Sequence, residues 1–264
     1  MARLRQGIIL GFIVLLVISI GSMVLALMSR SEVADLQEQV SALQASGAAT
    51  AQQPSAQPEP EQGIAEPMRL QGAKPRAADE FGALLIGDRG GSSVVEVFVD
   101  FQCPYCQRWD KELGDALISR ALTEESNLLV KINPLAFLGE TTADLSVPGA
   151  SARAANAAAC IAEYEKPAVL ASYVAAVYEV ADPSEPPGQF PPSQLVNIAT
   201  AAGAGVQTTE CIRTGAFIAY VAEVTRNSFV RGVGGTPTVV LNGSLVQDPF
   251  RSPELVALAA NPRS

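Results

Sequence analysis

The sequence contains no histidine among its 264 residues. Catalytic triads and Cys-His pairs that need an imidazole base are therefore excluded within this chain, as are His-ligated zinc and a histidine pH switch. Basic residues are also few, because 18 Lys and Arg stand against 27 Asp and Glu, for a net charge of −9. Affinity for nucleic acid depends on Lys and Arg, so we expect no nucleic-acid partner.

Cysteine is scarce as well, with only four in the chain. An even number of cysteines on the oxidising side of a membrane favours two disulfides. A Cys₄ zinc site is the alternative, but it usually needs two close pairs, whereas Cys160 and Cys211 lie 51 positions apart. The glycine-rich fragments are too short and misplaced for a phosphate loop. We therefore expect neither a metal nor a cofactor.

A long uncharged run, residues 7–29, is rich in Ile, Leu and Val. At about 1.5 Å per residue it would span roughly 35 Å as a helix, enough to cross a bilayer core of about 30 Å. A cleaved signal peptide is the alternative, although it usually has a shorter apolar core and a small-x-small cleavage site. Because Arg3 and Arg5 precede the run, the positive-inside rule places residues 1–6 in the cytoplasm. We expect a single-pass bacterial cell-membrane protein whose remainder is extracytoplasmic.

The next two segments connect this predicted signal anchor to a globular domain. Residues 30–44 contain two heptads with apolar a and d positions, fewer than a stable coiled coil needs. They predict a helical stalk, with a dimerisation seam as the alternative, so a monomer is favoured over a dimer. Residues 45–77 are rich in Ala, Gln and Pro, which predicts a flexible linker. The domain is expected at residues 78–264.

Within residues 78–264 the apolar pattern predicts an α/β core with a helical insert at about 137–232. Strands are expected at 81–86, 94–101, 128–135, 238–241 and 244–247. Helices are expected at about 103–122, 151–164, 167–180, 193–202 and 253–260, with one or two more between 211 and 231. The first long helix follows the second strand directly.

At that strand-to-helix switch lies the run Phe101-Gln102-Cys103-Pro104-Tyr105-Cys106. Cys103 would lie at a helix N-terminus, where unpaired N–H groups and the helix dipole stabilise a thiolate. Pro104 suits the first helical position, which needs no backbone donor. Cys106, one turn on, could then close a disulfide with Cys103. The spacing favours thiol–disulfide exchange, with a purely structural disulfide as the alternative.

Together with the run Gly235-Thr236-Pro237-Thr238, this motif makes residues 79–260 resemble the DsbA-like thiol:disulfide oxidoreductases. The resemblance implies a thioredoxin fold with an inserted all-helical subdomain. It implies that Cys103 is the exposed nucleophile and Cys106 its shielded partner. Pro237 would be a cis-proline beside them, and Thr236 would offer backbone groups to an extended substrate.

The chain departs from the family pattern at two positions. Tyr105 stands where members place a histidine, so imidazolium assistance to the thiolate is lost. Val97 stands six residues before Cys103, where members often carry an acid. Asp100, three residues before Cys103, could tune the thiolate or relay protons, with a solvated acid at a strand end as the alternative. Trp109 is expected in the core.

The resemblance also suggests the reaction and its partners. We expect an enzyme that introduces disulfides into unfolded exported proteins with free cysteines, reoxidised by a quinone-linked membrane protein. An isomerase or reductase is the alternative, as is a redox-inert thioredoxin-fold chaperone or binding module. We expect Cys160 and Cys211 to form a second disulfide within the helical insert, with a redox relay as the alternative. Closing a loop of about 50 residues would stabilise the insert by roughly 4 kcal/mol.

Overall fold

The computed structural model describes residues 64–138, 145–181 and 190–260. They belong to a unit of the chain that spans residues 62–264. The predicted cytoplasmic N-terminus, anchor and stalk, residues 1–44, lie outside the described residues. Within the three described ranges, no helix is both long and apolar enough to cross a bilayer.

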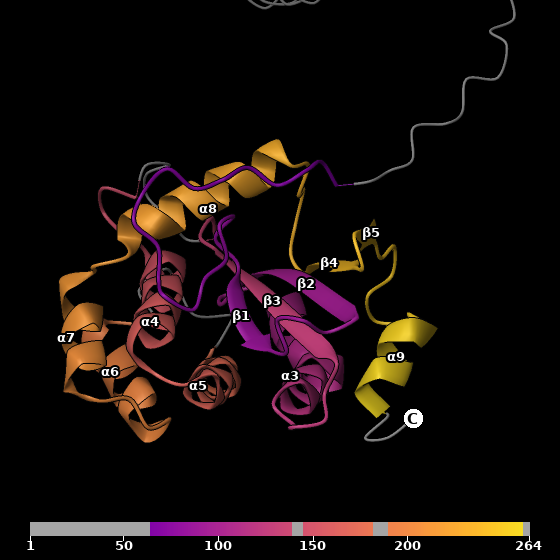
Figure 1. The fold of residues 1–264 in the computed structure, drawn as a ribbon. Coiled ribbons are helices and arrows are strands. Elements are labelled where there is room, and N and C mark those ends of the chain that lie inside the picture. The colour runs from indigo at the N-terminus through magenta and orange to yellow at the C-terminus, as the bar shows by residue number, and fades with distance from the viewer. Residues whose placement is uncertain (1–63, 139–144, 182–189, 261–264) are drawn as a thin grey trace, which may run out of the picture. The chain divides into compact units, whose positions relative to one another are not determined.

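A mixed five-stranded sheet forms the centre of the fold, with strand order β1-β3-β2-β4-β5 (Figure 1). Only β2 and β3 run parallel, and the other neighbours are antiparallel. The strands are β1 (Leu84–Gly87), β2 (Ser93–Asp100), β3 (Leu128–Leu135), β4 (Thr238–Leu241) and β5 (Ser244–Leu245). The two parallel central strands are nearly continuous in apolar residues, as expected where both faces of a sheet are covered.

The first strand starts three residues later than the predicted strand 81–86. The reason is a turn closed by Asp79, whose Oδ1 accepts hydrogen bonds from the N–H groups of Phe81 and Ala83 at 3.0 and 2.9 Å. Gly82 within that turn has a φ of 102°, which a residue with a side chain rarely adopts. The turn therefore uses residues that the apolar pattern assigned to the strand.

A helical run follows β2, but it is not one regular helix as the 103–122 prediction has it. It consists of α2 (Pro104–Trp109), the π-helical η1 (Asp110–Gly114) and α3 (Asp115–Ala121). Gly114 packs against the ring of Trp109, and a Cβ there would lie 2.7 Å from a ring carbon. The buried indole, expected in the core, thus lies at the point where the helix changes its hydrogen-bond pattern.

Helices connect β3 to β4 and form the predicted insert (Figure 1). They are α4 (Ala150–Tyr164), α5 (Pro167–Val180), α6 (Pro192–Ala201), α7 (Val206–Thr214) and α8 (Ile218–Val230), and α9 (Pro253–Ala260) closes the chain. The Ala-rich α4 is central, because small side chains allow α5, α6, α7 and α8 to pack around it. Helix α8 also contacts β3, so the insert covers part of the sheet as well as packing on itself.

The predicted linker 45–77 extends too far, because its last residues are bound to the domain. Residues 64–77 run along α8 and α4, as the indigo trace in Figure 1 shows. Ala65 N–H donates to the Arg231 carbonyl at 2.9 Å, and the N–H groups of Gln71 and Gly72 donate to the Glu223 carboxylate at 2.6 and 3.1 Å. Composition indicates flexibility here, but acceptors on a distant helix order the backbone. We call residues 64–77 the N-terminal strap.

Candidate active site

Cys103 is the N-cap residue of α2 and Pro104 occupies the first helical position. A turn after β2 presents the cysteine, because Cys103 N–H donates to the Asp100 carbonyl at 2.9 Å. Both Cys103 and Cys106 are free thiols in this structure. Cys106, one turn along the helix, is fully buried.

Cys103 is less accessible than the family resemblance implies. It is only 5 % exposed, and its thiol donates to the Thr236 carbonyl at 3.3 Å. The expectation of an exposed nucleophile is therefore wrong for this conformation, because the loop before β4 lies against the sulfur.

That loop reaches the cysteine through strand pairing. Strand β4 pairs with the end of β2, with Thr238 opposite Phe98, so the residues before β4 lie beside those after β2. The Thr236–Pro237 peptide bond is cis. A Cβ placed on Gly234 or Gly235 would meet nothing within 4 Å, so the loop borders open space. An extended chain has room to lie beside it.

The surroundings shift the pKa values of the two thiols in opposite directions. A hydrogen bond from Cys106 contributes most to lowering the pKa of Cys103 to about 6, helped by Thr236 and the N–H groups of Cys106 and Tyr105, against partial burial. Burial, followed by the interaction with Cys103, raises the pKa of Cys106 well above its ordinary value. The Thr236 hydroxyl is buried beside both sulfurs and has no hydrogen bond of normal geometry among the described residues.

Asp100 is a buried residue, so the solvated alternative is wrong. Its Oδ1 accepts from Gln102 N–H and the Ser151 hydroxyl, and its Oδ2 accepts from the N–H groups of Phe137 and Leu138, both at 3.1 Å. Burial raises the pKa of Asp100 to about 6, although these four donors oppose the shift. The carboxylate therefore ties the end of β2 to the loop after β3 and to the start of α4.

A second buried carboxyl, Asp110, was not singled out in the sequence. Asp110 is the first residue of η1 and is 5 % exposed. Among the described residues, no hydrogen bond to its carboxyl group is found. Burial and then the nearby charge of Asp115 raise the pKa of Asp110 to about 7, while Lys111 acts in the opposite direction. The i, i+4 spacing from Cys106 places both residues on the same helix face, which was an available signal.

Tyr178 on α5 packs against Phe101, at the end of β2 next to the dithiol. Its ring lies 5.4 Å from that of Phe101, and its hydroxyl is buried without a hydrogen-bond partner among the described residues. The side chain of Gln107 donates to the carbonyls of Tyr178 and Ala181, which fastens α5 to α2. Burial, then the charges of Cys106 and Asp110, raise the pKa of the Tyr178 phenol well above its ordinary range. No sequence signal links Tyr178 to the dithiol.

The other two cysteines lie in the helical insert. Cys160 on α4 and Cys211 on α7 form a disulfide, with an S–S distance of 2.02 Å and a Cα–Cα distance of 5.7 Å. Both are buried. Among the described residues, no three acidic, cysteine or histidine side chains gather as a metal site.

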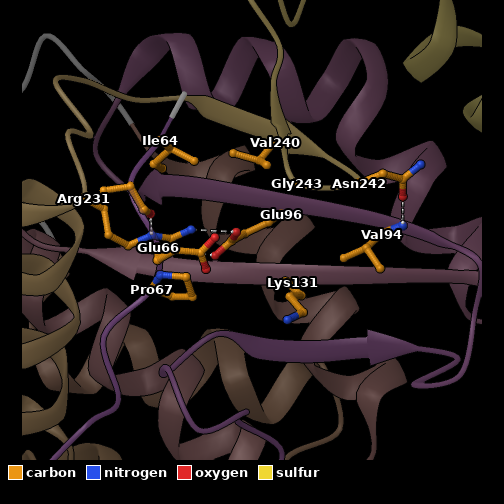
Figure 2. A pocket seen from close by; sticks show the side chains of 11 residues that line it. Ile64, Glu66, Pro67, Val94, Glu96, Lys131, Arg231, Val240, Asn242 and Gly243 are labelled. Carbon is orange, nitrogen blue, oxygen red and sulfur yellow. Dashed lines mark hydrogen bonds and ion pairs between the residues drawn. The ribbon is translucent and has the colours of Figure 1, made fainter. Parts of the chain in front are cut away.

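A separate pocket of about 420 Å³ opens on the sheet beneath the strap (Figure 2). Three of its charged side chains are paired, since Arg231 binds Glu96 at 2.8 Å and Lys131 binds Asp79 at 3.0 Å. Neither Cys103 nor Cys106 lines this pocket. Arg231 instead holds the end of α8, where the loop to Pro237 begins, against β2.

Comparisons with known proteins agree with this architecture. The family model described as thioredoxin matches residues 80–259. No curated protein matches the chain significantly. Among solved structures, reduced DsbA from Mycobacterium tuberculosis is 21% identical, with a TM-score of 0.52 over 67% of this chain and 98% of that one. MdbA from Corynebacterium matruchotii, a thiol-disulfide oxidoreductase, is 19% identical with a TM-score of 0.56, over 65% of this chain and 86% of that one.

BdbD from Bacillus subtilis is a further structural match, 14% identical with a TM-score of 0.54, over 70% of this chain and 95% of that one. At these identities the likeness concerns the fold. The expected thioredoxin fold, with helices inserted between β3 and β4, is confirmed.

Proposed function

The chain belongs to the thioredoxin family, and from that membership we propose that it is a protein thiol:disulfide oxidoreductase that introduces disulfides into exported proteins. One observation carries the proposal. Two neighbouring thiols beside a cis-proline have opposite pKa shifts, with Cys103 lowered to about 6 and Cys106 raised. Such a pair has one sulfur that is ionised at neutral pH and one that is protonated, as disulfide exchange requires.

In the oxidising direction the Cys103–Cys106 disulfide accepts two electrons. A substrate thiolate attacks Cys103 Sγ, the S–S bond breaks, and Cys106 leaves with the electron pair and takes up a proton. A second substrate thiolate then attacks the substrate sulfur of the mixed disulfide and releases Cys103 as a thiolate. The substrate gains a disulfide and the enzyme is left with one thiolate and one thiol.

The lowered pKa of Cys103 supports an oxidase over a reductase. A stabilised thiolate favours the reduced enzyme, which makes its disulfide a stronger oxidant. We expect a potential above the value of about −270 mV of thioredoxin. A potential near or below that figure would favour the reductase alternative.

Apolar side chains near the dithiol support the proposal that the substrates are unfolded proteins. Tyr105, between the two cysteines, is 62% exposed. Phe229, also exposed, has its ring 5.8 Å from Phe137, whose N–H binds Asp100. Exposed aromatic groups beside an open backbone loop suit an extended chain that has not yet buried its own apolar residues.

The test uses the purified full-length protein in mild detergent with a reduced, unfolded protein as substrate. Cys103→Ser should abolish oxidation of the substrate thiols. Cys106→Ser should accumulate mixed disulfides through Cys103, visible by non-reducing electrophoresis. Equal trapping by both variants would refute the assignment of nucleophile and partner, and wild-type protein without thiol activity would favour the redox-inert binding module.

We propose further that residues 7–29 anchor a monomer in the cell membrane, with the catalytic unit outside and a quinone-linked membrane protein as its oxidant. Because the strap is bound to the domain, the linker shortens to residues 45–63. At about 5–6 Å × √n, a flexible linker of this length would have an end-to-end distance of roughly 24 Å. Protease added to intact cells with a permeable outer envelope should digest the domain. Resistance until the membrane is broken would contradict the external location.

A further inference from the structure

We propose that Arg231 is a positioning residue that holds the cis-proline loop, residues 232–237, over the sulfur of Cys103, a role that rests on the proposed function. Ala65 of the N-terminal strap holds Arg231 in turn. Three features carry this inference, which are the fixed start of the loop, its fixed end and its glycine-rich middle.

The loop begins at a tightly bonded helix end. Arg231 is the C-cap residue of α8, and Gly232 follows with a φ of 93°, which favours glycine. The N–H groups of Gly232 and Val233 return to carbonyls in the last turn of α8 at 3.0 and 3.1 Å, as in a Schellman motif. The direction in which the loop leaves the helix is therefore set at Arg231.

The Arg231 side chain fixes this helix end to the sheet and to the strap. It is 8% exposed, and its guanidinium donates to both carboxylate oxygens of Glu96 on β2, at 2.8 and 3.1 Å (Figure 2). Its Nε donates to the Ala65 carbonyl at 3.1 Å, and Ala65 N–H donates to the Arg231 carbonyl at 2.9 Å. The planar fork of arginine suits such a set of acceptors. Three segments that are distant in the chain therefore meet at one buried side chain.

Strand β2 carries contacts at both ends of the loop. Glu96 and Phe98, two residues apart, lie on the same face of the sheet, and the guanidinium of Arg231 lies over the Phe98 ring, 5.0 Å from its centre. Phe98 is also the strand partner of Thr238, where β4 begins. The same strand leads into the turn that presents Cys103. A shift of Arg231 relative to β2 would therefore move the loop relative to the sulfur.

The middle of the loop is glycine-rich and borders open space. Val233 is buried, but a Cβ placed on Gly234 or Gly235 would meet nothing within 4 Å. Glycine also leaves the backbone more conformational freedom than any other residue. The Thr236 carbonyl nevertheless lies 3.3 Å from the sulfur of Cys103 and accepts its thiol hydrogen. Such a loop keeps one position because its ends are held.

The position of the loop affects the two kinds of reaction partner in opposite ways. The loop covers Cys103, which is 5 % exposed, so a small reagent reaches the sulfur only when the loop moves aside. The same loop offers the backbone of Thr236 to an extended chain, which binds best to a surface that is already in place. Arg231 should therefore slow the reaction with small reagents and strengthen the binding of unfolded chains.

The first measurement is alkylation of the reduced full-length protein by iodoacetamide in mild detergent. At about pH 8 the thiol of Cys103, whose pKa is about 6, is ionised, so its rate reports access to the sulfur. Arg231→Met should raise the rate at Cys103 about fivefold or more, because opening of the loop limits the reaction. Cys106 should stay unmodified, and mass spectrometry of peptides measures each cysteine separately.

The second measurement is oxidation of a reduced, unfolded protein by the oxidised full-length enzyme. Arg231→Met should raise KM about threefold or more and leave kcat within about twofold of the wild type. Arg231→Lys keeps a charge for Glu96 but lacks the planar fork, so it should restore part of both values. Ala65→Pro removes only the N–H that the strap donates to Arg231, and it should change both measurements in the same direction by less.

Lys131→Met is the matched control. Lys131 lines the same pocket as Arg231 and forms an ion pair there, but its partner Asp79 lies in the turn before β1. This variant should change neither the alkylation rate nor KM. If Arg231→Met does not fold, the double variant Glu96→Gln with Arg231→Met decides, because it leaves no buried charge without a partner.

The outcomes distinguish this inference from the proposed function. An unchanged alkylation rate of Cys103 or an unchanged KM in a folded Arg231→Met variant would overturn the inference alone, and so would equal changes in Lys131→Met. Alkylation of Cys106 as fast as that of Cys103 would show general unfolding and would also overturn it. A wild type that oxidises no substrate would overturn the proposed function, and the alkylation rates would still decide whether Arg231 holds the loop.

Discussion

The two cysteine pairs are alike in burial and different in everything that controls their chemistry. All four cysteines are buried, with Cys103 and Cys211 at 5% and 6% exposure. Yet Cys103 and Cys106 are free thiols at a helix N-terminus, whereas Cys160 and Cys211 bridge α4 and α7 across 51 positions of sequence. Burial therefore does not identify a reactive cysteine. A reactive cysteine is identified by the hydrogen-bond donors around its sulfur.

Cys103 lies where backbone N–H groups of α2 have no helical acceptor and can hydrogen-bond to a thiolate. Cys160 and Cys211 lie inside helices, where the N–H groups are used in the helix itself. We therefore expect the insert pair to close a long loop and the α2 pair to exchange electrons. Four measurements would test this contrast.

The largest expected difference is in reduction. In graded dithiothreitol, Cys103–Cys106 should open first and Cys160–Cys211 should persist, because structural disulfides have potentials below about −300 mV and oxidising dithiols lie near −120 to −180 mV. Alkylation of the full-length protein followed by mass spectrometry measures each pair. Opening of both pairs at the same dithiothreitol concentration would remove the distinction.

The next difference is in stability. Replacing both Cys160 and Cys211 with Ser should lower the free energy of unfolding by up to about 4 kcal/mol, because the disulfide restricts a loop of about 50 residues in the unfolded chain. Replacing both Cys103 and Cys106 with Ser is the matched control and should change stability much less, because the protein described here has both as free thiols. Denaturant unfolding gives both values.

The same double replacement in the insert should leave most oxidase activity intact. If activity falls while the unfolding free energy stays unchanged, Cys160 and Cys211 would belong to a redox relay. The structural assignment of the insert pair would then be wrong.

The smallest effect is the pH dependence of the redox potential. The pKa of Cys103 is lowered to about 6, so its thiolate stabilises the reduced protein. This stabilisation is fully present at pH values above the pKa of an ordinary thiol, and it is lost as the pH falls through about 6. Above pH 6, reduction of the disulfide takes up one proton, so the potential should change by about 30 mV per pH unit. Below pH 6, reduction takes up two protons, and the potential should change by about 59 mV per pH unit. A slope of 59 mV throughout pH 5–8 would contradict an ionised Cys103.

Much of the local structure follows from the order of residues. The predicted bounds 128–135, 167–180 and 238–241 agree with β3, α5 and β4. These segments have strong apolar periodicity or a proline at the helix start. The first strand and the helix after Cys106 are less regular, because Asp79 closes a turn in one and Gly114 meets Trp109 in the other. Both irregularities depend on contacts of individual side chains, which the spacing of apolar residues does not predict.

The dithiol itself is local, because the spacing of Cys103 and Cys106 and the proline between them already specify a helix start with a sulfur at its N-cap. Its surroundings are not local. Thr236 meets Cys103 because β4 pairs with β2, Asp100 meets Ser151 because α4 packs at the end of the sheet, and Tyr178 comes from the insert. Such contacts join positions far apart in the chain, so they depend on the packing of whole elements, which residue spacing does not encode. The local spacing therefore indicated which thiol is ionised, because Cys106 and the helix N-terminus act on Cys103 most strongly. The tertiary structure decided which distant groups, such as the Thr236 carbonyl and the Ser151 hydroxyl, surround the dithiol and Asp100.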